Sequence, residues 1–359
     1  MSDDNFEWVP AILATFLAIT MTAIIIIVSI IPRKKVVSQL NVYPIKSCGP
    51  MGVNSAQVTA RGFSYDRFAQ VSDSDGNYLT PRDKANVRLF LVRPTIVNHE
   101  QSSGTHLHLT CSDAFGSDQQ TAPFMIQNLN KVIKKSTTKE VTPMIGPKVK
   151  VKDLGDDVAK WLSKITKIED CRLTVIGPEY DRSVEMNPDQ GEAIPLLLEE
   201  RKKDTIPPVS LADEAPFLLT TASSLKDLNA RLAVRGKLKV GMQRFRPNIV
   251  VYGTKPWEED TWKRIKIGGS EFRVWQRCGR CSMTTIDRDT LERGPEPLAT
   301  LSTFRERSNG MRNFGMHMIP IMTSPTTEAS PSMVTVGDTL EILEYDEERL
   351  DEWKRLFDH

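Results

Sequence analysis

The sequence predicts an α+β protein that is mostly β and is preceded by one transmembrane helix. Many short stretches rich in β-branched and aromatic residues alternate with turn-forming residues, and only a few segments show a helical period. The chain has 359 residues, 40% of them hydrophobic, which suffices for one large or two ordinary domains. We therefore expect barrel-like β architecture with attached helices rather than a doubly wound sheet.

Residues 9–31 form an uncharged, strongly apolar segment. At about 1.5 Å per helical residue, this segment can cross a hydrocarbon core of about 30 Å. Acidic residues precede it, whereas a signal peptide would begin with a basic region. Arg33, Lys34 and Lys35 follow it, so the positive-inside rule places the rest of the chain in the cytosol. We expect residues 1–35 to be a membrane anchor with a transmembrane helix at about 9–31. A buried core helix and a cleaved signal peptide are the alternatives.

The part of the chain after the anchor is expected to begin with a β-rich module at residues 36–180. A helix is predicted at 156–165, because its apolar residues share one face. The polar, mixed segment 112–150 is expected to form long loops. A charged, Pro-interrupted connecting loop follows at 181–209.

A second β-rich domain is expected at residues 210–345, followed by an amphipathic C-terminal helix at 346–359. Within this domain, residues 217–232 predict a strand and then a helix that begins with Ser224 as its N-cap. Residues 283–287 predict a short strand.

Several kinds of chemistry have no motif in this sequence. There is no G-x-G-x-x-G, Walker loop, G-x-S-x-G elbow or H-E-x-x-H, which argues against nucleotide-dependent and serine-hydrolase chemistry. The formal net charge is +1, so no basic field over the whole chain points to nucleic acid.

The segment RCGRC places Cys278 and Cys281 three residues apart. A structural zinc would need a second ligand pair, which the sequence lacks, and a thioredoxin-type dithiol would open a helix. The expected cytosolic location disfavours a disulfide. Two interpretations stay open from the residues alone. One is a thiolate stabilised by Arg277 and Arg280 and suited to a soft metal. The other is a partly buried pair that fills a β core.

A set of motifs in fixed order carries more information than the cysteine pair. They are YPIKSC (43–48), DRF (66–68), APFLLTTASSLKDLNARL (215–232), RFRPNIVV (244–251), RCGRCSMTTID (277–287) and VGDTLEIL (336–343). Over roughly residues 38–345 the chain resembles the MOSC family, and within it the mitochondrial amidoxime-reducing components. The resemblance implies a β-barrel-like MOSC N-terminal module followed by a MOSC β-barrel domain.

The resemblance also implies a molybdenum cofactor, whose metal takes the second cysteine of the pair, Cys281, as its protein ligand. Fixed cations and amides suit the phosphate and pterin of that cofactor. The motif matches assign cofactor binding to Lys46, Ser47, Arg67, Arg246, Asn248, Gly279, Arg280, Cys281 and His317. The chain departs from the family pattern at Glu214, where a carboxylate near an anionic cofactor would be unfavourable. It departs again at His317, which stands where the family has an aromatic residue.

The implied activity is molybdenum-dependent reduction of N-oxygenated compounds, such as amidoximes and N-hydroxylamines. The sequence shows no flavin or nicotinamide motif, and no cysteine follows Cys281 that could hold an iron–sulfur cluster. We therefore expect an external donor, which the resemblance suggests is a cytochrome b5-type protein with its NADH-dependent reductase. The expected location is the mitochondrial outer membrane, with the catalytic part in the cytosol. The pyridoxal phosphate domain of a cofactor sulfurase does not fit in this length. The alternative function is a molybdenum cofactor or sulfur carrier without reductase turnover.

Overall fold

The computed structural model describes residues 34–99, 104–112, 122–183, 208–322 and 332–357, together with Ala14. The predicted transmembrane segment lies outside this part except for Ala14, and so does most of the connecting loop predicted at 181–209. None of the helices within the described ranges is both long and apolar enough to cross a membrane. The chain divides into Met1–Lys34 and Lys35–His359, and the fold below is that of the second unit.

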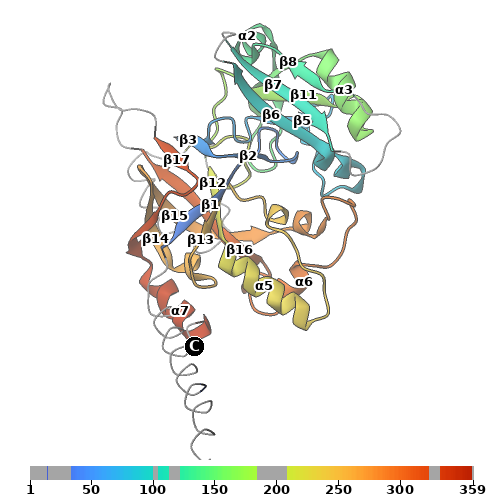
Figure 1. Ribbon diagram of the computed structural model, residues 1–359. Helices are drawn as coiled ribbons and strands as arrows, with labels where there is room; N and C mark the ends of the chain where they lie inside the picture. Colours follow the sequence, from blue (N-terminus) through green and yellow to red (C-terminus); the bar gives the residue numbers. More distant parts are fainter. Residues whose placement is uncertain are drawn as a thin grey trace, which may run out of the picture. The chain divides into compact units, whose positions relative to one another are not determined.

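An eight-stranded sheet is the largest element of the fold (Figure 1). In sheet order its strands are β18 (Leu340–Tyr345), β14 (Trp262–Ile267), β15 (Ser270–Arg280), β16 (Arg312–Ile321), β12 (Phe217–Thr221), β13 (Ile249–Tyr252), β1 (Val36–Val42) and β2 (Met51–Val53). Neighbouring strands run antiparallel except β12 and β13, which are parallel and are connected through α5 (Ala222–Val234). Val36 of β1 forms a β-bridge with Thr339, next to β18, which shows that the sheet curls on itself.

The concave side of this curled sheet holds one hydrophobic core. A small sheet of β17 (Met333–Thr335), β3 (Ser55–Thr59) and β4 (Gly62–Phe63) packs onto the same core. Phe217 contacts Phe63 and Phe272 edge to face, with ring centroids 5.0 and 5.2 Å apart. This geometry is the one that aromatic quadrupoles favour. Residues far apart in the chain therefore share one apolar interior.

A second core lies within residues 45–176, between two further sheets and the helices beside them (Figure 1). One sheet contains β5 (Ala69–Ser72), β11 (Arg172–Ile176), β10 (Val149–Asp153) and β9 (Thr137–Val141), and the other contains β6 (Val92–His99), β7 (Gly104–Cys111) and β8 (Phe124–Ile126). The helical segments are η1 (Lys84–Leu91), α2 (Leu129–Lys135) and α3 (Asp156–Thr166). The helix predicted at 156–165 is thus confirmed, and Val158, Trp161, Leu162 and Ile165 form its buried face.

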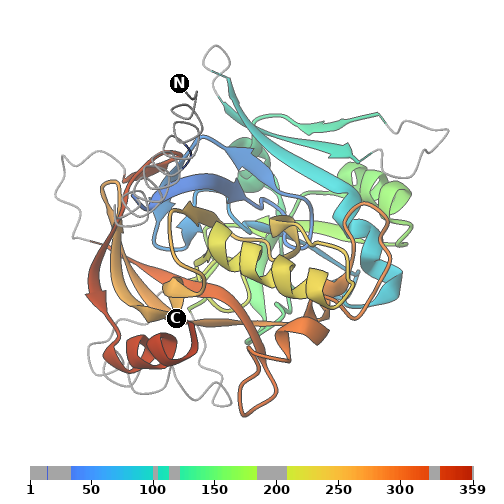
Figure 2. The same ribbon diagram turned by 60° about the horizontal axis from the view of Figure 1, so that its bottom comes forward.

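A third core lies where α5 meets β12, β13 and the short helix α6 (Leu298–Leu301). Figure 2 shows α5, in yellow, lying across the strands. The C-terminal helix α7 (Glu347–Phe357) joins this core through Trp353, with Leu350 and Phe357 beside it. The predicted terminal amphipathic helix is confirmed.

Two predictions of local secondary structure were wrong. Residues 122–150 are not long loops, because β8, α2 and β9 lie there and β10 begins within it. β9 buries only Val141, so its sequence shows no apolar alternation, and pairing with β10 makes it a strand. Residues 282–285 form the 3-10 helix η4 rather than part of a strand.

The hydroxyl groups of two threonines explain η4. The side chains of Thr284 and Thr285 donate to the carbonyl oxygens of Cys281 and Ser282, which competes with strand pairing. Helix α5 also begins earlier than predicted. Its N-cap is Thr221, whose side chain accepts a hydrogen bond from the Ser224 amide.

The predicted fold class, α+β with mostly β structure, holds for the described residues. The predicted domain bounds, 36–180 and 210–345, stay a prediction. Strands β1 and β2 precede the second range by far, yet they pair into the sheet that residues 217–345 build.

Candidate functional site

A cavity of about 330 Å³ brings the predicted site residues together. Its walls come from the loop after β1, the turn between β4 and β5, the segments that precede β12 and β13, and strands β15 and β16. Glu214 lines the cavity. So do all nine residues predicted from the motifs, which are Lys46, Ser47, Arg67, Arg246, Asn248, Gly279, Arg280, Cys281 and His317. Positions separated by more than 200 residues in the chain therefore face one space.

Two arginines and an asparagine form one wall of the cavity. The guanidinium groups of Arg67 and Arg246 each lie 4.3 Å from the ring centre of Tyr43. Arg67 Nη1 donates to the Asn248 side-chain oxygen at 3.1 Å and pairs with Asp66 at 2.6 Å. Arg246 Nη1 donates to a backbone carbonyl at 2.7 Å. Cation–π contacts and charged hydrogen bonds together fix both guanidiniums without neutralising Arg246.

The backbone is unusual at three of the predicted positions. Ser47, Arg67 and Arg246 have φ values of 69°, 46° and 56°, in the left-handed region that non-glycine residues rarely adopt. Such strain persists only where the surrounding structure over-determines it, and it clusters at functional sites. The turns that present these side chains are thus held in place by the fold around them.

The opposite cation, Lys46, is almost fully buried and forms an ion pair with Asp213 at 2.6 Å. Its ammonium group also lies 4.3 Å from the ring centre of Tyr78, whose hydroxyl group hydrogen-bonds Ser47. Burial lowers the pKa of Lys46, although the Asp213 carboxylate opposes this effect. The pair stays charged because Lys46 and nearby arginines hold the pKa of Asp213 low despite burial.

The two cysteines are free thiols with different surroundings. A register shift in the β15–β16 pairing falls between Arg277 and Gly279, and such bulges re-aim side chains beside active sites. Cys278 is buried, which raises the pKa of its thiol to about 12. Cys281 is partly exposed at the point where β15 ends and η4 begins. Of the two sulfurs, that of Cys281 is therefore the accessible one.

One arginine beside Cys281 was not among those that the sequence suggested. This residue is Arg82: burial acts to lower the pKa of Arg82, but the neighbouring Cys281 and Asp213 side chains raise it above its usual value. Arg280 lines the cavity, but its guanidinium donates to the carbonyl oxygens of Phe314 and Phe245. The expectation that Arg277 stabilises the thiolate was wrong, because its side chain turns away from the cavity.

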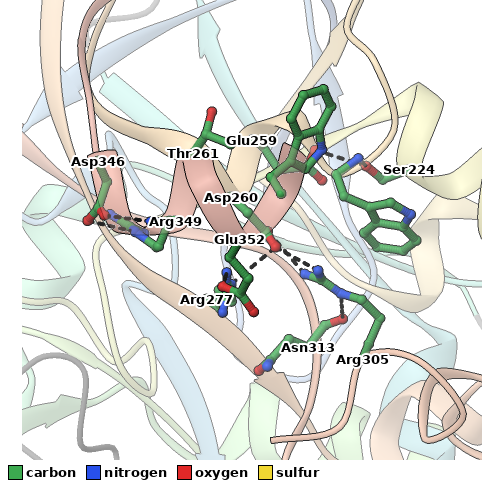
Figure 3. Close-up of polar contacts among 12 residues, drawn as sticks. Ser224, Glu259, Asp260, Thr261, Arg277, Arg305, Asn313, Asp346, Arg349 and Glu352 are labelled. Atoms are coloured by element: carbon green, nitrogen blue, oxygen red, sulfur yellow. Dashed lines mark hydrogen bonds and ion pairs between the residues drawn. The ribbon is translucent and has the colours of Figure 1, made fainter. Parts of the chain in front are cut away.

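A buried charge network holds Arg277 instead (Figure 3). Its Nε lies 3.1 Å from Asp260, and its Nη2 lies 2.5 Å from Glu352 of α7. Asp260 also accepts hydrogen bonds from Nη1 and Nη2 of Arg305, at 2.6 and 3.0 Å. The network ties α7 to β15, the strand that carries Cys278 and ends next to Cys281.

His317 and Glu214 form a pair on another side of the cavity. The imidazole Nδ1 lies 3.4 Å from a Glu214 carboxylate oxygen, and Gln276 donates to the same oxygen at 3.4 Å. Burial, with the charge of Arg280, lowers the pKa of His317 to about 3. The imidazole is therefore neutral at physiological pH.

The cavity has a surplus of positive charge. Among the described residues that line it, six side chains are cationic (Lys46, Arg67, Arg82, Arg244, Arg246, Arg280) and two are acidic (Asp213, Glu214). No three His, Cys, Asp or Glu side chains within the described ranges gather as a metal site. An anionic ligand is the chemistry that this arrangement favours.

Comparison with known proteins agrees with this architecture. A model of the MOSC N-terminal beta barrel domain matches residues 34–169, and a model of the MOSC domain matches residues 207–341. Mitochondrial amidoxime-reducing component 1 of Mus musculus is 31% identical, with 86% of this chain and 82% of that protein aligned. The human protein of the same name is 32% identical over the same shares. The chain belongs to the MOSC family.

Other relatives of this MOSC protein carry a different name. Molybdenum cofactor sulfurase of Danio rerio is 30% identical over 78% of this chain but only 31% of its own length. Among solved structures, YiiM from Geobacillus stearothermophilus aligns with 36% of this chain at 15% identity and a TM-score of 0.25.

Sequence reasoning missed three residues that line the cavity of this MOSC protein. Tyr78, Arg82 and Asp213 lie in loops with no motif, and each contacts a predicted residue: Ser47, Cys281 and Lys46. A signal for them was absent, because loop residues meet their partners only through the fold.

Proposed function

We propose that this MOSC protein is a molybdenum-cofactor-dependent reductase of N-oxygenated compounds, such as amidoximes and N-hydroxylamines. The observation that carries the proposal is the convergence of nine motif residues on one cation-rich cavity, with the accessible Cys281 sulfur at its wall. The names of the amidoxime-reducing relatives support the same activity.

The residues present fit the cofactor. Its phosphate and dithiolene are anionic. Three of the six cations that line the cavity pair with carboxylates, whereas Arg82, Arg246 and Arg280 form no ion pair within the described residues. Burial and the neighbouring Arg67 both lower the pKa of Arg246, and no carboxylate of the described residues forms an ion pair with it, so a bound anion would supply its counter-charge. Arg82 Nε, which is buried, has no hydrogen-bond partner among the described residues. Both features are those of a site built for an anion.

Each wall then has its own task. Lys46, Arg67 and Arg246 would hold the phosphate and the negative edge of the pterin, with Ser47 and Asn248 donating hydrogen bonds. Gly279 lies directly against Met311 at this wall, since a Cβ on it would be 2.3 Å from the end of the Met311 side chain. The Cys281 thiolate would be the protein's ligand to the metal, with Arg82 and Arg280 balancing its charge. When bound, the cofactor supplies the two-electron chemistry that removes oxygen from an N–OH group.

The reaction R=N–OH + 2 e⁻ + 2 H⁺ → R=NH + H₂O consumes protons, and His317 and Glu214 are the residues placed to hold one. Glu214, in its protonated carboxyl form, can deliver a proton, and the neutral imidazole of His317 lies beside it, with Nδ1 3.4 Å from a carboxyl oxygen. Because the pKa of His317 is about 3, a doubly protonated imidazolium is not the donor at neutral pH. The proton of the Glu214 carboxyl is therefore the one that we assign to the substrate.

Electrons have to reach the cavity from another protein in this proposal. A cytochrome b5-type donor with its NADH-dependent reductase is the proposed source. We also propose that residues 9–31 anchor the chain in the mitochondrial outer membrane, with Lys35–His359 in the cytosol. The word "mitochondrial" in the relatives' names and the basic residues after the apolar segment support this location.

A second candidate is a carrier of the cofactor or of its sulfur, without reductase turnover. The match to molybdenum cofactor sulfurase over 78% of this chain favours it. Such a protein would bind the pterin and metal but would reduce no N-hydroxylated compound with any electron donor.

The test is a comparison of Cys281→Ala with the matched variant Cys278→Ala. Both are produced in a host that makes the cofactor and are assayed for molybdenum content, metal-centred spectra and reduction of an aryl amidoxime by a chemical reductant. We expect stoichiometric metal in the native protein, loss of turnover and of the native spectrum in Cys281→Ala, and largely native behaviour in Cys278→Ala. Equal losses from both variants would refute a single-cysteine ligand. Full metal content without turnover in the native protein would favour the carrier.

A further inference from the structure

A second cavity, of about 200 Å³, shares one wall residue with the candidate cofactor cavity. Arg246 lines both, and Arg93 and Arg288 complete a triangle of arginines around the smaller space. The remaining lining includes the buried Cys48, the ring of Phe90 and the exposed Asp289. We call it the Arg288 cavity. No motif pointed to it, and the proposed reductase function does not use it.

Arg288 is the least satisfied of these three cations. Its side chain is 8% exposed, and its guanidinium stacks on Phe90, 3.5 Å from the ring centre. Nη2 makes two long hydrogen bonds of 3.4 Å to backbone carbonyls, and Nη1 has no partner among the described residues. A buried cation held only in this way is destabilising by itself.

No carboxylate within the described ranges forms an ion pair with Arg93, Arg246 or Arg288. The nearby Asp287 pairs with Arg244 instead, at 2.6 Å. Burial lowers the pKa of Arg288 well below its usual value, and the charges of Arg246, Arg244 and Arg93 act in the same direction. The three guanidiniums therefore repel one another in a region that water screens poorly.

The backbone is shaped to bring Arg93 into this triangle. Gly49 lies so close to Arg93 that a Cβ on it would be 2.5 Å from the guanidinium Nη1 and 3.1 Å from the Val92 carbonyl oxygen. Arg93 in turn donates to the Phe90 carbonyl, in the segment whose ring supports Arg288. Both cations are thus fixed around the cavity rather than free to reach solvent.

We propose that the Arg288 cavity binds a phosphate group through Arg93, Arg246 and Arg288. Guanidinium forks match the geometry of phosphate oxygens, and a dianion would offset the repulsion among three buried cations. The volume lies below that of cavities for drug-sized ligands, which points to inorganic phosphate or the phosphate end of a phosphomonoester. The carboxylate of Asp289, at the cavity wall, would repel an anion. We therefore expect the phosphate to lie next to the three arginines.

Because Arg246 lines both cavities, phosphate in the smaller one would also stabilise the wall of the larger one. Coupling of this kind is reciprocal, so each occupant would change the affinity for the other by the same factor. The phosphate could come from solution, or it could be the phosphate of the molybdenum cofactor itself. These two sources make different predictions for cofactor-free protein and cofactor-loaded protein.

The experiment measures thermal unfolding of the full chain, with and without cofactor, as inorganic phosphate replaces chloride at constant ionic strength. Arg288→Met keeps the apolar contact with Phe90 and removes the charge. Arg235→Met, at the exposed C-cap of α5, is the matched control. We expect phosphate to stabilise native protein and Arg235→Met, with affinity about 10-fold to 100-fold weaker in Arg288→Met. Without phosphate, Arg288→Met should be at least as stable as native protein, because it lacks the unpaired charge.

The two sources are then separated by the cofactor-loaded form. If it still responds to phosphate, the ligand is free phosphate. If only cofactor-free protein responds and Arg288→Met also lowers the pterin content, the ligand is the cofactor's own phosphate. Equal responses of native protein and Arg288→Met would mean an adventitious ion only and would overturn the proposal, as would no response at all. The cofactor-free measurement requires no turnover, so its failure is distinct from failure of the reductase proposal.

Discussion

Asp260→Asn tests the buried charge network that holds Arg277 of β15 (Figure 3). Asp260 is 1% exposed and accepts hydrogen bonds from Arg305 at 2.6 and 3.0 Å and from Arg277 at 3.1 Å. Asparagine preserves the shape but removes the charge that neutralises both guanidiniums. Arg305 would then have no carboxylate ion-pair partner among the described residues, while Arg277 would keep Glu352.

The expected loss in free energy of unfolding is about 3–5 kcal/mol, the range for a buried ion pair that loses one partner. That is a large part of the roughly 5–15 kcal/mol that stabilises a typical domain. The matched control is Glu344→Gln, which breaks the Lys263–Glu344 pair, where both side chains are more than 40% exposed. Removing an exposed pair should change stability by less than about 1 kcal/mol.

Urea unfolding followed by circular dichroism measures both variants, and equal m-values would show that the unfolded state is unchanged. The fall in stability at acid pH gives an independent check. Burial acts to raise the pKa of Asp260, but Arg305 and Arg277 hold it below its usual value. The stabilisation is therefore present above the unfolded pKa of about 4 and is lost as pH falls through the lower folded pKa. If Asp260→Asn costs no more than Glu344→Gln at neutral pH, the network does not stabilise the fold and the reasoning fails.

Two further predictions concern Glu259 and Gly315. Burial and the neighbouring Asp260 raise the pKa of Glu259 to about 7, so ionisation destabilises the fold as pH rises from about 4.5 through 7. Glu259→Gln should remove this slope. Its free energy of unfolding, relative to that of native protein, should rise by on the order of 2 kcal/mol between about pH 5.5 and pH 8. Urea titrations at several pH values measure this difference, and parallel pH profiles of the two proteins would contradict the prediction. Gly315→Ala places a Cβ 2.6 Å from the Leu219 carbonyl oxygen at φ +78°, whereas Gly337→Ala, at φ +95°, meets nothing within 4 Å. Both variants carry a backbone strain of about 1–2 kcal/mol, because alanine disfavours a positive φ. Gly315→Ala adds a steric clash, so its melting temperature should fall further than that of Gly337→Ala. Equal melting temperatures would show that the strands adjust to the new side chain.

Local patterns predicted several elements because their physics is local. Helix α3 and helix α7 each carry an apolar face at helical spacing, and that face alone requires a core to pack on. Strand β9 was missed because only one of its residues is buried, so its identity comes from pairing with β10. The N-cap of α5 was misplaced because Ser224 turns its hydroxyl group to the buried Glu259, a partner 35 residues away.

The candidate site divides in the same way. By itself, the sequence determined which motif residues to examine, and all nine line one cavity, although their roles stay proposals. Only the tertiary structure decided which charges meet. It turns Arg277 away from the thiols, sets Arg82 beside Cys281 and leaves Arg288 buried with no counter-ion among the residues that the structure describes. The physical reason is that a charged side chain has no preferred place in a sequence. Its energy depends on burial and on partners that long-range strand pairing brings near, and neither exists until the chain has folded.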